Sequence, residues 1–268
     1  MNNIDEYIAC WLREYALKAK KDGFVVGVSG GVDSAVTSTL CAMTNLTTFC
    51  LMMPIHQAHD QVLRAHSHVK WLTEHYPNVK YHSIPLTTPY TELNWVLPPD
   101  ITPLAEANTK SRLRMVTLYA YATTYNLLVA GTGNKVEDFG CGFFTKGGDG
   151  GVDLSPIGNL TKTEVWDLAK KLGINEEIIN ATPTDGLWSD NRSDEDQMGA
   201  SYPELEKAMA WLEQFIEVDQ YSVMTDVNNG TYTELNEREK EVLNIYWGFH
   251  TRNRHKMLMP PICPKYEA

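Results

Sequence analysis

The stretch FVVGVSGGVDSAV, residues 24–36, decides the fold of this chain. Its apolar, β-branched run at 24–28 predicts a buried strand, and the pattern after Val32 predicts a helix. Between them lie Gly30 and Gly31, which have no side chains and let the backbone approach a ligand closely. A strand that ends in such a loop before a helix gathers backbone N–H groups around one point, where the helix dipole is positive. The stretch therefore predicts a phosphate-binding loop.

This loop differs from the P-loop of nucleoside triphosphatases. The lysine of the GxxxxGK[ST] pattern is missing, and Asp33 and Ser34 stand where its lysine and hydroxyl residue would be. A carboxylate beside a phosphate repels it unless a divalent cation joins the two, so we expect Asp33 to bind Mg²⁺. The alternative is a tight turn with Asp33 as an ordinary acidic residue at a helix N-terminus.

The rest of the first half repeats the alternation of strand and helix. Further apolar runs predict strands at 47–54, 79–85 and 126–132, separated by segments of helical length. Parallel strands joined by helical crossovers give this pattern, so we expect an α/β fold with a doubly wound, mostly parallel sheet. Helices are expected at 3–21, 109–125 and 161–173, and the first should bury Ile4, Ile8, Trp11, Leu12 and Tyr15.

Two features suggest surfaces with a function. The segment 109–125 is apolar nearly all round after Arg114, so we expect it to be buried on more than one side, with a subunit interface as one way to cover the second. Glycine-rich and acidic stretches at about 140–160 and 183–202 predict long loops, and loops of this length usually serve binding or catalysis. Without an internal repeat or a linker, residues 1–268 are expected to form a single domain.

Composition limits the class of protein. The 268 residues are 43% hydrophobic and 21% charged, values typical of a globular enzyme. The first twenty residues lack the apolar core of a signal peptide, and the five cysteines form no CxxC motif, so we expect a cytoplasmic protein. The formal net charge of −11 argues against a non-specific grip on nucleic acid. An anionic ligand must therefore be met by a local basic cluster or a metal ion.

Motifs along most of the chain carry a resemblance to a known family. SGGVDS at 29–34 resembles the pyrophosphate-binding loop of the ATP pyrophosphatases, which have a Rossmann-like fold related to the adenine nucleotide alpha hydrolases. Further segments resemble, in order and spacing, the ammonia-dependent NAD synthetases. They are ANTKSRLRM (107–115), GTGNKVED (131–138), GFFTKGGDGGVDLSPIGNLTKTEV (142–165), PTDGLW (183–188), SDEDQMGASYPELE (193–206) and NRHKM (253–257).

The resemblance implies a reaction. ATP adenylates the nicotinate carboxylate of deamido-NAD and releases pyrophosphate, and ammonia then displaces AMP to leave the carboxamide of NAD. Mg²⁺ is the implied cofactor, with Asp33 and Glu137 as its ligands. Asp33, Glu137 and Lys162 are the implied catalytic residues. The implied ATP-binding residues are Gly27, Val28, Ser29, Gly30, Gly31, Val32, Asp33, Ser34, Thr132, Lys162 and Thr184.

The second substrate is expected to touch two subunits. By the same resemblance, deamido-NAD contacts Arg112, Lys146, Asp153, His255 and Lys256, and the last residues belong to a basic C-terminal segment. This sharing implies a homodimer. Arg112 and Arg114 lie two residues apart on a predicted helix and therefore point to different faces, so only one of them should share the side of the ligand. Arg112 is the expected one.

Two alternatives remain open from the sequence. One keeps the ATP pyrophosphatase chemistry but changes the acceptor, for example to tRNA or a purine. The other is a nucleotide sensor that has kept the pocket without catalysis. The histidines at 56, 59, 66 and 68 have spacings that can serve a metal, but neutral surface histidines are the expected interpretation.

Overall fold

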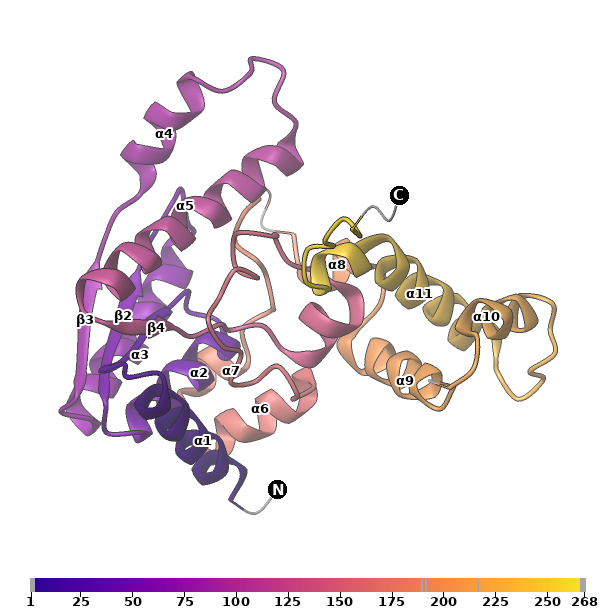
Figure 1. Cartoon of the computed structure of the whole chain (residues 1–268), viewed down its shortest axis with the longest axis horizontal. Helices are drawn as coiled ribbons and strands as arrows, with labels where there is room; N and C mark the ends of the chain where they lie inside the picture. Colours follow the sequence, from indigo (N-terminus) through magenta and orange to yellow (C-terminus); the bar gives the residue numbers. More distant parts are fainter. Residues whose placement is uncertain (1–2, 189, 191, 216, 266–268) are drawn as a thin grey trace.

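A four-stranded parallel sheet forms the centre of the molecule (Figure 1). The computed structural model describes residues 3–188, 190, 192–215 and 217–265. Strands appear where the sequence predicts them, at β1 (Gly23–Gly27), β2 (Thr47–Met52), β3 (Val79–Ser83) and β4 (Leu127–Val129). Their order is β3-β2-β1-β4, and every pair is parallel. The chain therefore reverses its direction of winding between β1 and β4, which is the topological switch point of a doubly wound sheet.

Helices cover both faces of the sheet, because neighbouring residues of a strand point to opposite sides. Phe24 and Val26 of β1 pack with helices α1, α2 and α6, whereas Val25 packs with α4 and α5. Helix α3 packs beside α2. The helices around the sheet are α1 (Ile4–Lys18), α2 (Val32–Met43), α3 (His59–His75), α4 (Thr87–Trp95), α5 (Pro103–Thr124), α6 (Lys162–Lys171) and α7 (Glu176–Ile179).

The C-terminal third forms a second hydrophobic cluster beside the sheet (Figure 1). Its elements are the π-helix η1 (Lys135–Cys141) and helices α8 (Asp194–Met198), α9 (Tyr202–Glu213), α10 (Gln220–Asn228) and α11 (Glu237–Met257). The sequence analysis did not predict these helices. The loop expected over 183–202 contains α8, and the basic C-terminal segment is the last turns of α11. Ser189 and Asn191 of that predicted loop lie outside the described residues.

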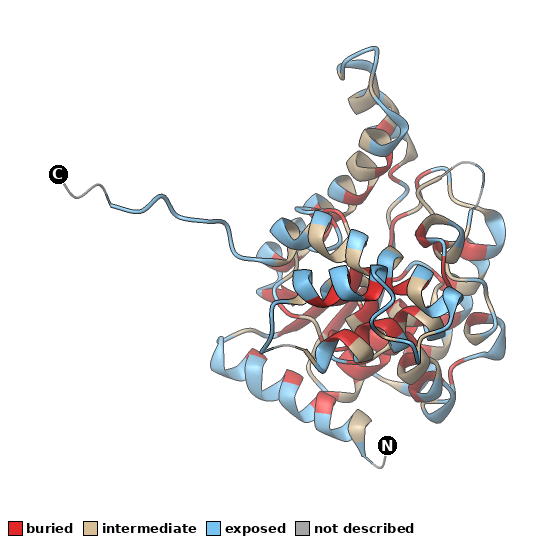
Figure 2. Cartoon of the chain, turned by 90° about the vertical axis from the view of Figure 1, so that its right-hand side faces the viewer, coloured by how far each residue is buried: buried red, intermediate tan, exposed pale blue. Residues whose placement is uncertain are grey.

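One expectation about a buried helix face needs correction, and the expected second covered side of α5 stays a prediction. On α1, Ile8 and Leu12 are buried, but Trp11 and Tyr15 are exposed, because Ala9 and Ala16 complete the buried face. Figure 2 shows α1, next to the N-terminus, with buried positions recurring between exposed ones. Helix α5 begins at Pro103, earlier than expected, with Thr102 as its N-cap. One side of α5 packs on the sheet, whereas Val116 on another side is 66% exposed. This chain alone does not bury α5 on more than one side.

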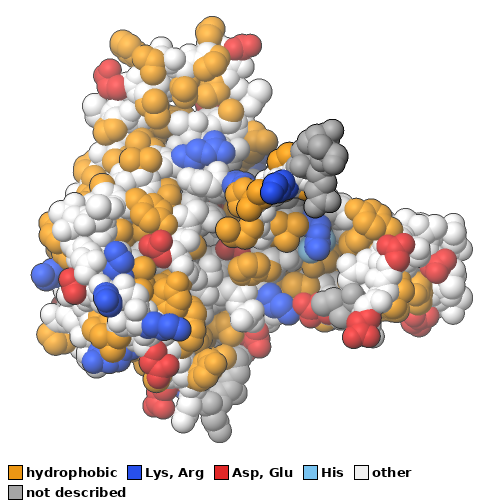
Figure 3. Space-filling model, in the orientation of Figure 1, with side chains coloured by type: hydrophobic (Ala, Val, Ile, Leu, Met, Phe, Trp, Pro, Cys, Tyr) orange, Lys and Arg blue, Asp and Glu red, His pale blue; other side chains and the backbone are white. Residues whose placement is uncertain are grey.

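Exposed apolar side chains gather at one end of the molecule. Trp95, Val96 and Leu104 are exposed, and they lie at the end of α4, in the turn after it and at the start of α5. Figure 3 shows hydrophobic side chains at the top of the molecule, where Figure 1 places these elements. Within the described ranges, no helix is both long enough and apolar enough to cross a bilayer.

His68 corrects the expectation of surface histidines. It is buried on α3, and its Nε2 lies 2.9 Å from the Ser38 hydroxyl of α2. Burial lowers the pKa of His68 from its ordinary 6.5 to about 4. Proton binding therefore favours the unfolded chain at mildly acidic pH.

We predict that His68 makes the protein less stable as the pH falls from 7 to 5. In the unfolded chain the imidazole binds a proton near pH 6.5, whereas in the folded protein it stays neutral until about pH 4. This difference costs about 2 kcal/mol over that interval. Urea unfolding of wild type and His68→Gln at both pH values measures it: the variant should lose about 2 kcal/mol less. Equal losses would contradict the assignment.

Candidate active site

The glycine loop lies at the switch point, after the carboxyl end of β1. The Ser34 hydroxyl accepts from the Ser29 N–H at 3.2 Å and donates to the Gly31 carbonyl at 2.9 Å. Gly30 has φ +89°, and a Cβ there would lie 2.3 Å from the Gln61 carbonyl oxygen, so only glycine fits between the loop and α3. The first N–H groups of α2 have no partner within the helix. They are the groups that an anion at this loop would meet.

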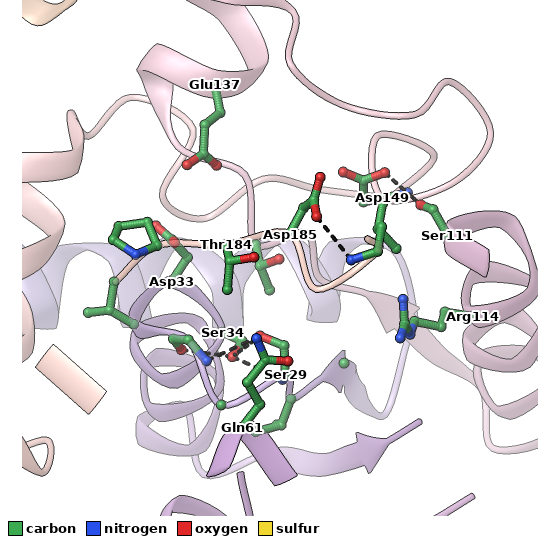
Figure 4. A pocket seen from close by; sticks show the side chains of 18 of the residues that line it. Ser29, Asp33, Ser34, Gln61, Ser111, Arg114, Glu137, Asp149, Thr184 and Asp185 are labelled. Atoms are coloured by element: carbon green, nitrogen blue, oxygen red, sulfur yellow. Dashed lines mark hydrogen bonds between the residues drawn. The ribbon is translucent and has the colours of Figure 1, made fainter. Parts of the chain in front are cut away.

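A cavity of about 250 Å³ opens above this loop (Figure 4). It brings together segments that lie far apart in the sequence, from β1 to the residues around 184. Every residue that the sequence analysis assigned to ATP lines it, namely 27–34, Thr132, Lys162 and Thr184, and so does Glu137. The other ionisable side chains of its wall are Arg64, Arg114, Asp149, Asp185 and Asp194.

Lys162 links the two carboxylates that the sequence analysis paired. Its Nζ lies 2.6 Å from Asp33 Oδ2 and 3.1 Å from Glu137 Oε1, and its side chain is only 2% exposed. Burial disfavours the ammonium ion, but the charges of Asp33 and Glu137 outweigh this effect and raise the pKa of Lys162. Lys162 is thus a buried cation at the end of the glycine loop. Thr161 holds it there, because its hydroxyl and Glu164 form the capping box that starts α6.

Tyr202 completes this charged cluster, and the sequence analysis missed it. Its Oη donates to Glu137 Oε1 at 2.5 Å and lies 3.3 Å from Asp194 Oδ2, while Lys162 Nζ lies 4.7 Å from its ring centroid. Burial, and then the charge of Glu137, raise the pKa of Asp194 to about 8. At neutral pH this carboxyl group can therefore carry a proton. Tyr202 lies in the segment SDEDQMGASYPELE, which carries part of the family resemblance, but the segment itself does not predict a contact with Glu137.

The residues expected to contact deamido-NAD do not line the cavity of this chain. Four of them meet at the end of α11. Lys146 Nζ donates to the His255 carbonyl at 2.9 Å, Lys256 Nζ donates to the Phe144 carbonyl at 2.7 Å, and Arg112 Nε donates to the Lys146 carbonyl at 3.3 Å. They form one basic group, which α5, α11 and the loop after η1 contribute together.

Asp153 lies apart from this group. Its carboxylate accepts from Tyr119 Oη at 3.0 Å and from the Val129 N–H at 2.8 Å. It therefore ties the glycine-rich segment to the end of β4 and to α5.

The two arginines of α5 point to different faces, as their spacing predicts. Arg112 reaches the Lys146 carbonyl outside the cavity. Arg114 lines the cavity instead, where its Nε donates to the Met53 carbonyl at 3.1 Å and its Nη2 donates to Gln57 Oε1 at 3.3 Å. A ligand inside this cavity would thus meet Arg114 rather than Arg112.

Asp33 and Glu137 fit a magnesium site in their chemistry. Both carboxylates converge on the same Nζ, so their oxygens face a common point. Among the described residues no group of three His, Cys, Asp or Glu side chains could hold a metal. Two carboxylates suffice for Mg²⁺, which usually keeps several waters and takes further oxygens from substrate phosphates. Asp33 is 17% exposed and bonded to Lys162, so it is less accessible than a loop position suggests.

We predict that Tyr202→Phe destabilises the protein by about 1–3 kcal/mol, because it removes the hydrogen bond to the enclosed Glu137 carboxylate. Chemical denaturation at pH 7 measures the change. Tyr221→Phe is the matched control, since Tyr221 lies on the surface of α10 and should change stability little. Equal stability of the two variants would show that the Tyr202 hydroxyl is not important for the cluster.

Comparison with known proteins agrees with this geometry. The family model described as NAD synthase matches residues 4–260. The NH(3)-dependent NAD(+) synthetase of Carboxydothermus hydrogenoformans is 44% identical over 207 residues, which cover 75% of this chain and 82% of that protein. The enzyme of the same name from Methanosarcina mazei is 33% identical and is covered over 99% of both chains.

Solved structures share the whole fold. The NMN synthetase of Francisella tularensis superposes with a TM-score of 0.80 at 30% identity, and the NH3-dependent NAD synthetase of Campylobacter jejuni with 0.75 at 26% identity. Each comparison covers 98% of both chains. The match of the family model spans nearly the entire sequence, and it includes the glycine loop and the Lys162 cluster. The chain belongs to the NAD synthase family.

Proposed function

We propose that this protein amidates deamido-NAD to NAD, using ATP and ammonia and releasing AMP and pyrophosphate. One observation carries the proposal: Lys162, Asp33 and Glu137 meet at the end of a glycine loop, in the cavity of a chain that belongs to the NAD synthase family. A cavity that concentrates a cation and helix N–H groups suits the meeting of a carboxylate with a polyphosphate.

The chemistry needs two displacements. In the first, a carboxylate oxygen attacks the α-phosphorus of ATP, the bond to the bridging oxygen breaks, and pyrophosphate leaves with that oxygen. In the second, ammonia attacks the acyl carbon, AMP leaves with the acyl oxygen bonded to phosphorus, and the nitrogen loses a proton. The first displacement places extra negative charge on phosphate oxygens, and so does the departure of AMP in the second. Lys162 and the first N–H groups of α2 are the groups of this chain that would stabilise that charge.

Asp33 and Glu137 would hold Mg²⁺, which when bound would offset the charge of the triphosphate and of the leaving pyrophosphate. The charge of Lys162 has the same sign as the metal, and in this structure Lys162 contacts the oxygens that the metal would need. Its long, flexible side chain can turn toward a phosphate oxygen when a cation approaches the two carboxylates.

We further propose that Arg112, Lys146, Asp153, His255 and Lys256 act on a dinucleotide shared between two copies of the chain. Their position outside the cavity supports this, since a ligand held there by one chain would extend away from the glycine loop. The exposed Val116 on α5 supports a homodimer as well. Residues 1–268 would act as one domain. The five cysteines are free thiols, which supports a role in the reducing cytoplasm.

A specific observation favours one other acceptor. The Francisella tularensis structure is described as an NMN synthetase, and it resembles this chain over 98% of both lengths. Amidation of nicotinate mononucleotide would use the same ATP chemistry on a smaller substrate. An unrelated acceptor such as a purine or tRNA, and a sensor without catalysis, remain the alternatives that the experiments must exclude.

We predict that purified protein with ATP, Mg²⁺ and ammonium forms NAD from deamido-NAD, and does so with a higher kcat/KM than it forms NMN from nicotinate mononucleotide. Chromatography of the products and of AMP measures both reactions. A preference for the mononucleotide would reassign the substrate. Folded protein that releases pyrophosphate with neither acceptor would exclude the proposed function.

We predict that Lys162→Met lowers kcat by about 100-fold or more, because it removes the buried cation next to the reacting phosphates. Lys170→Met is the matched control, since Lys170 lies on the same helix but is exposed and far from the cluster. The control should keep wild-type kcat. If both variants retain activity, Lys162 has no part in catalysis.

A further inference from the structure

The ionisable side chains of the cavity do not suit a polyphosphate as they stand. Five are carboxyl groups, namely Asp33, Glu137, Asp149, Asp185 and Asp194, of which Asp194 can carry a proton at neutral pH, and three are cations, namely Arg64, Arg114 and Lys162. Lys162 already contacts two of the carboxylates. A triphosphate bound at the glycine loop therefore needs another cation close to that loop. The choice is between the two arginines.

Arg64 is the arginine that contacts the loop. It projects from α3, its side chain is 17% exposed, and its Nε donates to the Gly30 carbonyl at 3.3 Å. Helix α3 and the loop can lie close together here because Gly30 has no Cβ; a Cβ would collide with the Gln61 carbonyl. The guanidinium group is thus held at the edge of the loop. Arg114 donates hydrogen bonds to Met53 and Gln57, and within the described ranges it has no hydrogen bond to residues 29–34.

The present partners of Arg64 leave it able to bind an anion. Its Nη1 lies 2.7 Å from Asp60 Oδ2, but Asp60 is 67% exposed, and an ion pair of this kind between neighbouring turns contributes little to stability. The guanidinium group has more N–H donors than these two contacts use. A phosphate group can accept two parallel hydrogen bonds from arginine, which makes it a stronger partner than a solvated carboxylate.

We propose that Arg64 binds the β- and γ-phosphates of ATP and the pyrophosphate that leaves. The inference rests on the proposed function and adds a residue to it that neither the glycine-loop motif nor the other quoted segments contain. Arg64 supplies the positive charge on the α3 side of the loop, while Lys162 supplies it on the α6 side. The leaving group is thus held from two sides.

Binding experiments separate this role from a structural one. Titration calorimetry in the presence of Mg²⁺ would compare AMP with α,β-methylene-ATP, which keeps all three phosphates but resists cleavage at the α–β link. Arg64→Gln should bind the ATP analogue at least about tenfold more weakly than wild type, because a charge-assisted pair is lost. Its affinity for AMP should stay within about twofold, since AMP has no β- or γ-phosphate, and this also reports that the variant is folded.

Two further variants sharpen the result. Asp60→Asn breaks the same ion pair but leaves the arginine, so it should bind the analogue at least as well as wild type. Arg64→Lys keeps the charge and should bind the analogue more tightly than Arg64→Gln does; it also serves if the glutamine variant does not fold. The inference is overturned if Arg64→Gln weakens AMP and the analogue equally, or neither. Wild-type protein that fails to bind the analogue would overturn the proposed function as well.

Discussion

The contact of one buried ammonium group with two carboxylates determines how this site is built. Lys162 comes from the start of α6, Asp33 from the first turn of α2 and Glu137 from η1, so three elements must meet within a few ångströms. None of these charges could remain in so enclosed a position alone, because each would lose its hydration without compensation. For Lys162 the charges of Asp33 and Glu137 supply that compensation, and they raise its pKa despite its burial.

The arrangement of the sheet explains why these elements meet. Strand β1 lies between β2 and β4; α2, which follows β1, packs on one face of the sheet, and α5, which leads into β4, packs on the other. A switch point of this kind opens a crevice at the carboxyl ends of the strands. The glycine loop fills one side of that crevice, and the segment from Ala130 through η1 fills the other. The C-terminal cluster closes it from outside, with Tyr202 reaching into it from the first turn of α9. The charged cluster around Lys162 thus lies where the sheet and its helices meet the C-terminal cluster.

The sequence predicted the sheet more fully than the site. Strands and the glycine loop are local patterns, since β-branched runs and a glycine pair act over a few residues, and all four strands appear in the expected places. The set of residues expected to contact ATP came from the resemblance, and its members do share one cavity. The sequence could not predict the contacts of Tyr202 and Arg64, because these contacts depend on how helices distant in the sequence pack together. Tyr202 reaches Glu137 from α9, and Arg64 reaches the glycine loop from α3. The burial of His68 likewise depends on α2 and α3 lying together. Trp11 and Tyr15 have the spacing of a buried helix face, but they lie outside the face by which α1 packs on the rest of the protein.

The last turns of α11 hold the loop after η1 by a row of side-chain contacts to backbone carbonyls. Lys256 donates to the Phe144 carbonyl and Asn253 Nδ2 to the Cys141 carbonyl, while Lys146 reaches back to the His255 carbonyl. Gly142 is tightly enclosed here, since a Cβ would lie 2.6 Å from that of Asn253. The last turns of α11 and the glycine-rich segment are therefore held to each other. A substitution in the last turns of α11 would therefore disturb the loop that carries Phe143 and Asp149, although no residue of α11 itself lines the cavity.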